Sequence, residues 1–339
     1  MRHFFYFGGM DMKKIIELKN ISKSFDGEVV LDHINLDIYD NEFLTLLGPS
    51  GCGKTTTLRL IGGFTTPDEG DVIFMGENIN ELPPYKRNVN TVFQRYALFP
   101  HLNVFENVAF PLREKKVPRE EIEQRVGEML KMVALTGFEH RSVTSLSGGQ
   151  QQRVAIARAL ATNPKIILCD EATSALDPTT TTSILNLLRE INRRMGITIV
   201  IITHEMSVVE STCTHVAIID DGQLAECGTV ESVFSQPKSA AAKKLIFRTT
   251  GADSGAMGER MIRIVFEGSS ADEPTISDLA MQCHVAVNIR YADTREVSGK
   301  LFGQMILQLP EDHLQQEKAI YFLQNKGLRV EEVNGHVHG

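Results

Sequence analysis

The feature that most constrains this chain is a glycine-rich loop placed between an apolar run and a helix. Residues 43–47 are apolar and predict a buried strand, and residues 56–61 predict the helix that follows. The loop itself is Gly48-Pro49-Ser50-Gly51-Cys52-Gly53-Lys54-Thr55, and Thr56 continues it into the helix. This order of strand, loop and helix is typical of a backbone that wraps around phosphate groups.

The loop residues have distinct expected tasks. Glycines let backbone N–H groups turn inward around phosphate oxygens, and the helix N-terminus adds partial positive charge. Lys54 is expected to reach the β- and γ-phosphates, and the Thr55 hydroxyl is expected to ligate Mg²⁺. The sequence therefore predicts a site for a nucleoside triphosphate and its magnesium ion, with residues 48–56 as candidate binding residues.

Composition excludes several classes of function. The chain has 339 residues, enough for two domains, and its formal net charge of −8 gives no basic surface for nucleic acid. Its five cysteines are scattered, which favours reduced thiols over a disulfide framework. Apolar stretches such as residues 197–202 are too short to cross a bilayer, and residues 1–11 lack a cleavable signal pattern. We expect a soluble cytoplasmic protein whose ordered part starts near Met12.

Residues 15–39 alternate between apolar and polar side chains on either side of the turn Asp26-Gly27. This pattern predicts a hairpin in a small antiparallel sheet beside the nucleotide-binding core. Phe25 falls at the edge of the hairpin. Its ring is either a core aromatic or a ring that stacks on an adenine base, and the pattern favours neither.

Two carboxylates end the apolar run at residues 165–171. Ligands bind at the carboxyl ends of the strands in open α/β sheets, so this pair is a better candidate for catalysis than for a solvated loop end. We expect Asp170 to hold Mg²⁺ through water, and Glu171 to orient or deprotonate the attacking water.

Gln94 and His204 also follow apolar runs, at residues 90–93 and 197–203. The Gln94 amide can touch the metal ion or the attacking water, and His204 is expected to contact the γ-phosphate. Helices alternate with apolar strands throughout this region. Such alternation predicts a mostly parallel sheet covered on both faces.

A second predicted anion-binding site begins at residue 146. The sequence Leu146-Ser147-Gly148-Gly149-Gln150 opens a helix predicted at residues 151–161, so that its serine and glycines stand at the helix N-terminus. One nucleotide needs one phosphate cradle, so the second cradle requires an explanation. A further helix starts at Asp177-Pro178, with Asp177 as its N-cap.

These motifs together resemble the ATP-binding subunit of ABC transporters, over roughly residues 15–246. The resemblance implies an α/β fold, namely a P-loop NTPase domain of the ABC type with a helical subdomain. Its most specific element is the run at residues 146–150, which resembles the family's signature motif. The family implies a head-to-tail homodimer in which these signature residues of one subunit close on the γ-phosphate bound by the other. That arrangement accounts for the second cradle, formed by Ser147, Gly148, Gly149 and Gln150.

The resemblance also implies roles for single residues. Phe25 matches the adenine-stacking aromatic, and Gln94 matches the residue whose loop couples to the permease. Glu171 matches the catalytic glutamate, Asp177 the aspartate that contacts the dimer partner, and His204 the switch histidine. The implied cofactors are ATP and Mg²⁺. The implied metal ligands are Thr55, Gln94 and Asp170.

A small second domain is predicted beyond a linker rich in Gly, Ser, Thr and Ala. The pattern there predicts strand, helix, strand, strand, helix and strand at residues 262–266, 274–282, 284–291, 301–309, 313–325 and 328–333. This order is the ferredoxin-like βαββαβ unit, an α+β fold with both helices on one face of the sheet. The expected segments are a disordered extension at 1–11, an ATP-binding domain at 12–247, the linker at 248–259 and the small domain at 260–335.

Two resemblances compete within the family. Residues 47–112 look most like polyamine (spermidine/putrescine) importer ATPases, whereas the chain from residue 146 onward looks like methionine importer ATPases. Residues 285–289 and 302–305 resemble the regulatory C-terminal (NIL-type) domain of the methionine importers, which binds methionine and restrains transport. Because a whole domain weighs more than a local loop pattern, we expect methionine import, with Asn288 as an effector residue. Polyamine import is the alternative.

The implied assembly is a homodimer on the cytoplasmic face of the cell membrane, beneath two separate permease subunits that a substrate-binding protein supplies. An ABC ATPase that acts on DNA or ribosomes, outside transport, is the alternative of a different class. Such proteins usually carry long coiled coils, paired cassettes or basic arms. The sequence shows none of these features, and we expect no nucleic-acid partner.

Overall fold

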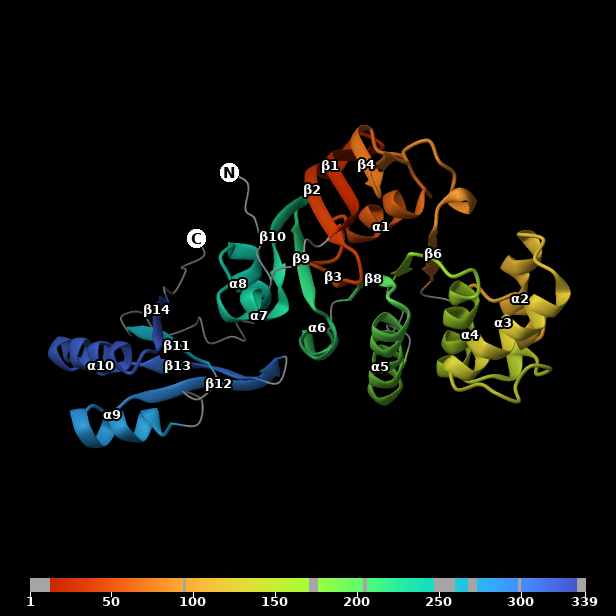
Figure 1. Ribbon diagram of the computed structural model, residues 1–339. Helices are drawn as coiled ribbons and strands as arrows, with labels where there is room; N and C mark the ends of the chain where they lie inside the picture. Colours follow the sequence, from red (N-terminus) through yellow and green to blue (C-terminus); the bar gives the residue numbers. More distant parts are fainter. Residues whose placement is uncertain are drawn as a thin grey trace. The chain divides into compact units, whose positions relative to one another are not determined.

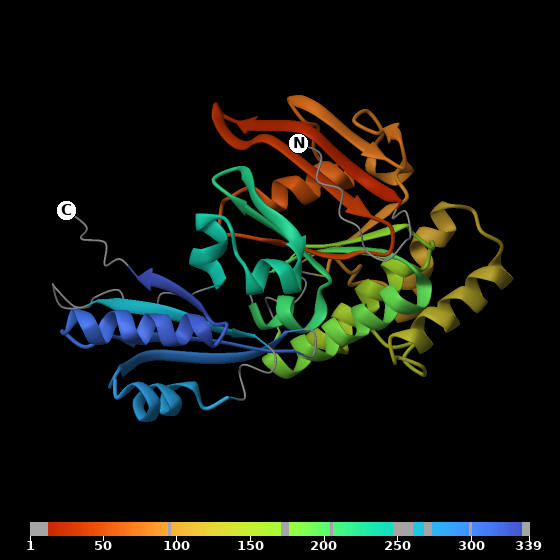
Figure 2. The same cartoon turned by 60° about the vertical axis from the view of Figure 1, so that its left-hand side comes forward.

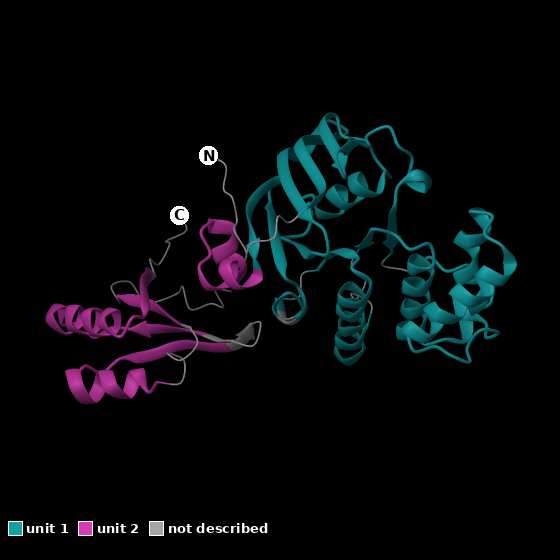
Figure 3. Ribbon diagram, viewed as in Figure 1, with its two compact units in different colours: residues 1–229 teal, residues 230–339 magenta. Residues whose placement is uncertain are grey.

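The computed structural model describes residues 13–93, 96–170, 176–203, 206–246, 260–267, 273–297 and 300–333. The chain divides into two compact units, residues 1–229 and 230–339, which Figure 3 shows in different colours. Each unit has its own sheets, helices and hydrophobic core. None of the described helices combines the length and the apolar character that a bilayer crossing requires.

Unit 1 begins with a four-stranded antiparallel sheet in the order β2-β1-β4-β5. Its strands are β1 (Lys14–Phe25), β2 (Glu28–Tyr39), β4 (Glu69–Phe74) and β5 (Glu77–Asn78). The predicted hairpin is confirmed, because β1 and β2 pair directly on either side of a two-residue turn. Both turn residues, Asp26 (φ 50°) and Gly27 (φ 86°), adopt the left-handed conformation that such a tight turn needs.

The second sheet of unit 1 has six strands in the order β10-β9-β3-β8-β7-β6. Its strands are β3 (Phe43–Leu47), β6 (Val89–Val92), β7 (Ile166–Cys169), β8 (Thr198–Ile202), β9 (His215–Asp220) and β10 (Gln223–Thr229). All pairings are parallel except that of β10 with β9. Every residue of β3, β7 and β8 is buried, as expected for strands covered on both faces.

Helices complete the core of unit 1. Helix α1 (Lys54–Gly62) lies between the two sheets in both views (Figures 1 and 2), and its apolar side chains share one buried cluster with both. On the other side of the six-stranded sheet lie α5 (Pro178–Met195) and α6 (Met206–Thr212). A helical group packs together beside β6 (Figure 1), consisting of α2 (Val104–Glu114), α3 (Arg119–Met132) and α4 (Gly148–Leu160). Short 3₁₀ turns lie at Pro84–Lys86 and Val143–Ser145.

Helix ends follow local capping rules. The Oδ1 atom of Asp177 accepts a hydrogen bond from the N–H of Thr180 (3.0 Å), and Gly196 (φ 61°) ends α5 in the left-handed conformation. Helix α3 ends at Met132. The reason is that Ala134 (φ 55°) turns the chain into the left-handed conformation.

Unit 2 starts with two short helices, α7 (Val230–Ser235) and α8 (Ala240–Ile246). The predicted βαββαβ order follows, as β11 (Met261–Glu267), α9 (Thr275–Cys283), β12 (Asn288–Val297), β13 (Lys300–Gln308), α10 (His313–Asn325) and β14 (Arg329–Val333). The four strands form an antiparallel sheet in the order β12-β13-β11-β14, and both helices share its core. The second strand begins later than predicted because His284 (φ 55°) caps α9 in the left-handed conformation.

Candidate functional site

The glycine-rich loop joins β3 to α1 at the carboxyl edge of the parallel strands. Gly48 has a φ of 152° and Gly53 a φ of 104°, conformations that residues with a side chain rarely adopt. A Cβ atom on Gly48 would lie 2.0 Å from the carbonyl oxygen of Ile219, and one on Gly53 would lie 2.4 Å from a Leu31 methyl group. The fold itself therefore requires glycine at both positions, in agreement with the phosphate-binding pattern.

The Lys54 side chain folds back over this loop. Its Nζ donates hydrogen bonds to the carbonyl oxygens of Gly48 (2.9 Å) and Pro49 (2.6 Å), and the residue is only 8% exposed. These partners are neutral dipoles, which hold the ammonium group without neutralising its charge. A buried cation in such a setting favours the binding of an anion, because an uncompensated buried charge is costly. The loop and Lys54 together fit a phosphate group.

Thr55 and Asp170 meet at the same edge of the sheet. The Oγ1 atom of Thr55, in the first turn of α1, lies 3.4 Å from the Oδ1 atom of Asp170, which directly follows β7. The pair presents a hydroxyl and a carboxylate oxygen, and Mg²⁺ prefers such hard oxygen donors. The two side chains therefore fit the magnesium ion that the sequence predicts here.

Gln94, Glu171 and His204 lie outside the described residues, so their contacts with a nucleotide stay predictions. The strands that precede them are described. β6, β7 and β8 are parallel neighbours, and each of the three residues stands two positions after the end of one of these strands. The topology therefore brings the ends of the three strands to the edge that holds Asp170.

Ser147 caps α4 through a reciprocal pair of hydrogen bonds. Its Oγ accepts from the backbone N–H of Gln150 (3.3 Å), and the Gln150 Oε1 accepts from the backbone N–H of Ser147 (3.0 Å). A Cβ atom on Gly149 would lie 2.5 Å from the Thr180 methyl group, so glycine lets α4 approach α5 closely. Gly148 is the first helical residue. The second helix N-terminus is thus present, and its binding to a nucleotide stays a prediction.

Three other predicted site residues have defined surroundings. Phe25 is 44% exposed at the end of β1, so its ring is no core aromatic, and stacking on adenine stays a prediction. Hydrogen bonds from the side chain and backbone of Thr180 lower the pKa of Asp177 below its ordinary value. In unit 2, Asn288 is exposed at the start of β12, where its Nδ2 donates to the Oε1 atom of Gln308 (3.3 Å).

Sequence reasoning missed Arg87, which anchors the end of α1. This arginine is 7% exposed, and burial lowers the pKa of its guanidinium group. Its Nη1 donates to the carbonyl oxygens of Leu60 (2.7 Å) and Ile61 (2.9 Å). Its other hydrogen bonds reach the carbonyl oxygens of Leu82, Ile79 and Asn80. No sequence signal separates an arginine that bonds to backbone carbonyls from one that lies on the surface.

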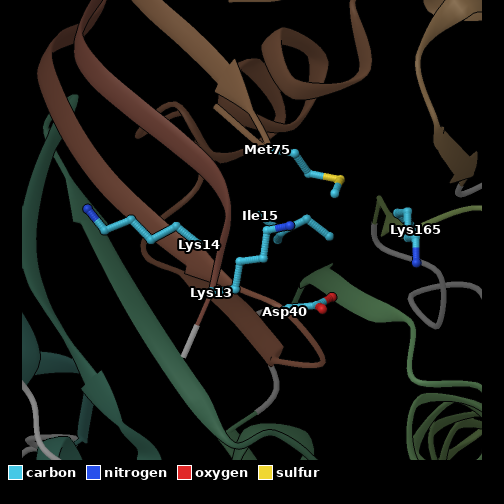
Figure 4. A pocket seen from close by; sticks show the side chains of 6 residues that line it. All are labelled: Lys13, Lys14, Ile15, Asp40, Met75 and Lys165. Carbon is cyan, nitrogen blue, oxygen red and sulfur yellow. The ribbon is translucent and has the colours of Figure 1, made fainter. Parts of the chain in front are cut away.

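A shallow hollow lies at the opposite edge of the parallel strands (Figure 4). Its lining residues are Lys13, Lys14, Ile15, Asp40, Met75 and Lys165. Asp40 precedes β3 and Lys165 precedes β7, so this is the amino-terminal edge, away from the glycine-rich loop. The lysine side chains point in different directions in Figure 4, and Lys14 pairs with Glu17 and Asp37. The hollow therefore has no convergent set of polar groups and is not the nucleotide site.

Comparison with known proteins agrees with this geometry. Residues 31–174 match the ABC transporter family and residues 260–332 match the NIL domain. The spermidine/putrescine import ATP-binding protein PotA of Clostridium novyi (strain NT) is 51% identical over 234 residues, which are 69% of this chain and 67% of that protein. The methionine import ATP-binding protein MetN of Desulfitobacterium hafniense (strain Y51) is 41% identical over 337 residues, which are 94% of this chain and 99% of that protein.

A solved structure shows the same fold. It is a dimeric ATP-binding cassette in a post-hydrolysis state, bound to ADP and Pi, and it is 38% identical to this chain. The superposition has a TM-score of 0.58 and covers 64% of this chain and 99% of that chain. The chain therefore belongs to the ABC transporter family, as the ATP-hydrolysing subunit of an importer.

Proposed function

We propose that this importer ATPase drives the uptake of methionine through separate permease subunits. The small domain carries the proposal, because residues 260–332 match the NIL domain and the alignment with the methionine import protein includes 99% of that protein. In methionine importers, which the small domain resembles, such a domain binds methionine and restrains transport. An effector domain has no use without its ligand, so its presence favours methionine.

Polyamine import is the second candidate. The identity of 51% with the spermidine/putrescine import protein exceeds the identity of 41% with the methionine import protein. That alignment, however, spans only 67% of the polyamine relative, whereas the small domain of this chain has its own match. The higher identity therefore supports a shared mechanism of ATP binding and hydrolysis more than a shared transported substrate.

The chemistry that we propose starts from the residues at the carboxyl edge of the sheet. The loop N–H groups and Lys54 bind the β- and γ-phosphates, and Thr55 and Asp170 hold Mg²⁺. When bound, the metal ion neutralises negative charge on the phosphate oxygens as the γ-phosphoryl group leaves. We assign Glu171 as the residue that orients and deprotonates the attacking water, with His204 at the γ-phosphate. Three further residues complete the proposed site. We place Gln94 beside the metal ion and the Phe25 ring against adenine, and Asp177 contacts the dimer partner.

The assembly that we propose is a head-to-tail homodimer on the cytoplasmic face of the membrane, with two permease subunits and a substrate-binding protein. Each subunit presents its signature residues, Ser147–Gln150, to the nucleotide of the other. The N-cap geometry of Ser147 supports this role, because a helix N-terminus attracts anions. We further propose that the ATP-binding domain comprises residues 12–247 and that residues 248–259 link it to the small domain at 260–335.

Isothermal titration of the full-length chain with methionine and with spermidine tests the substrate. We expect heat with methionine and none with spermidine, because an apolar thioether fits an apolar pocket whose few polar groups fix its amino and carboxylate ends. Asn288→Ala is expected to abolish this heat. Asn325→Ala is the matched control, since Asn325 is also exposed in unit 2, at the end of α10. Heat with spermidine alone would replace methionine by polyamine in the proposal.

A further inference from the structure

The chain directly after residues 94–95 contains two consecutive left-handed residues. Tyr96 has a φ of 60° and Ala97 a φ of 48°, and neither is a glycine. In this conformation the Cβ atom of an L-residue crowds its own backbone, so the conformation costs free energy at each position. Such strain persists where the surrounding structure holds it in place. Contacts from other elements must therefore stabilise the backbone of Tyr96 and Ala97.

Arg158 on α4 holds both residues. Its Nη1 donates a hydrogen bond to the carbonyl oxygen of Ala97 (2.7 Å), and its Nη2 donates to the carbonyl oxygen of Tyr96 (3.0 Å). The guanidinium group is planar, so the directions of these two donors are fixed relative to each other. Its central carbon also lies 5.7 Å from the ring centroid of Phe99. One rigid group thus orients two successive carbonyls.

The Tyr96 side chain also lies near the start of α4. A Cβ atom on Gly148, the first residue of the helix, would lie 3.1 Å from the Tyr96 hydroxyl oxygen. Tyr96 therefore lies close to α4 at Gly148, and both Tyr96 and Ala97 are bonded to α4 through Arg158, further along the helix. A displacement of α4 must act on the backbone that follows Gln94.

We propose that Arg158 is a positioning residue for ATP hydrolysis. It holds Tyr96 and Ala97 in the left-handed conformation and so connects the chain after Gln94 to α4, the helix that begins at the signature residues. The hydrogen bonds from Arg158 affect the hydrolysis step more than ATP binding, because the phosphate-binding loop, Gly48–Thr55, is a separate segment. The alternative is a purely structural role, in which Arg158 only packs α4 against Phe99.

Replacing Ala97 by glycine separates these roles. Glycine adopts positive φ about as readily as negative φ, so it favours the left-handed backbone without the hydrogen bonds from Arg158. In full-length protein with Mg²⁺ and ATP, we expect Arg158→Ala to lower kcat about tenfold and to change the KM for ATP less than about twofold. Adding Ala97→Gly is expected to raise the kcat of Arg158→Ala about fivefold. A glycine at position 97 adopts the left-handed conformation with little strain, so the hydrogen bonds from Arg158 are no longer needed to maintain it.

Ala134 provides the matched control, since it is another exposed alanine in the left-handed conformation (φ 55°). Ala134→Gly is expected to leave the kcat of Arg158→Ala low. Arg158→Lys keeps the charge and the aliphatic stem but cannot orient two carbonyls as a planar group can, so we expect it to behave like Arg158→Ala. If Arg158→Ala does not fold, the effects of Ala97→Gly and Ala134→Gly on kcat are measured in Arg158→Lys instead.

Hydrogen–deuterium exchange gives a measurement independent of turnover. The N–H of Tyr96 donates to the carbonyl oxygen of Phe93 (3.0 Å), and we expect this amide to exchange faster in Arg158→Ala than in the wild type. Three results would overturn the proposal. They are an unchanged exchange rate at Tyr96, a wild-type kcat in Arg158→Lys, and a failure of Ala97→Gly to restore kcat beyond Ala134→Gly.

Discussion

The hydroxyl oxygen of Thr55 lies 3.4 Å from the carboxylate of Asp170, although 115 positions separate the two residues in the chain. The contact joins the start of α1 to the end of β7. Two motifs far apart in the sequence, both of which were predicted to hold the magnesium ion, thus place a hydroxyl and a carboxylate oxygen side by side.

This relationship predicts how the enzyme depends on magnesium. Asp170→Asn replaces a charged oxygen donor by a neutral amide, so we expect the Mg²⁺ concentration for half-maximal ATPase activity to rise about tenfold. ATP binding measured in the presence of a chelator is expected to stay unchanged. Titration of the ATPase rate with Mg²⁺ checks this, and an unaltered magnesium requirement would remove Asp170 from the metal site.

A second prediction concerns the catalytic step. Glu171→Gln is expected to bind ATP but to lose turnover about 100-fold or more, because the amide cannot accept the proton of the attacking water. Size-exclusion chromatography of this variant with ATP is expected to show a trapped dimer. Hydrolysis near the wild-type rate would show that another group orients the water.

A third prediction separates binding from turnover. Lys54→Ala removes the buried ammonium group beside Gly48 and Pro49, so we expect the Kd for ATP to rise about tenfold or more. Lys165→Ala is the control, because that lysine lines the hollow at the opposite edge of the sheet. Fluorescence titration with a labelled nucleotide measures both. Equal affinities in the two variants would contradict the assigned role of Lys54.

A fourth prediction concerns the thiol inside the loop. Cys52 is 5% exposed, and its Sγ lies 3.6 Å from the Nζ of Lys54. Because this thiol lies inside the phosphate-binding loop, a bulky reagent attached to Cys52 is expected to block access of the nucleotide. Bound ATP is expected to slow this inactivation. Inactivation of Cys52→Ala at the wild-type rate would identify another cysteine as the target.

A fifth prediction concerns pH and stability. Glu42 is buried before β3, where its Oε2 accepts from the N–H of Tyr39 (2.6 Å) and its Oε1 lies 3.2 Å from the Nδ1 of His215. Burial raises the pKa of Glu42 from 4.5 to about 7. Between these values the folded state binds more protons than the unfolded state. The free energy of unfolding therefore falls as pH rises through this window, by about 3 kcal/mol in total.

Glu42→Gln removes this titration while its amide oxygen can still accept from Tyr39. We expect urea denaturation to show that the variant gains stability relative to the wild type between pH 5 and pH 8. Burial also lowers the pKa of His215, whose contribution to stability is lost as pH falls and so has the opposite sign to that of Glu42. A difference between variant and wild type that does not change with pH would contradict the raised pKa of Glu42.

The elements that the sequence predicted best are those governed by neighbouring residues. The turn at Asp26-Gly27 and the caps of α5 at Asp177 and Gly196 follow from local backbone preferences. Helix α10 has its predicted bounds, His313–Asn325. The start of β12 differs from its predicted position because His284, which is not a glycine, adopts the left-handed conformation, and tertiary packing decides that conformation.

The candidate site divides in the same way. The loop around Lys54 and the pair of carboxylates at the end of β7 are motifs whose spacing carries their chemistry. Arg87 and Arg158 bond to carbonyl groups of segments distant in the chain, and an arginine has no side-chain pattern that announces such partners. Their roles depend on the paths of other segments, which only the folded structure supplies.

The reciprocal cap of Ser147 and Gln150 has a consequence for how two subunits join. The Ser147 oxygen accepts the Gln150 N–H through a lone pair, and a hydroxyl group keeps its hydrogen for donation to another acceptor. In the homodimer that we propose, a phosphate bound by the second subunit would receive that hydrogen while α4 keeps its first turn. Closure of the proposed dimer would then require no unwinding of α4, because the new hydrogen bond would add to an intact helix cap.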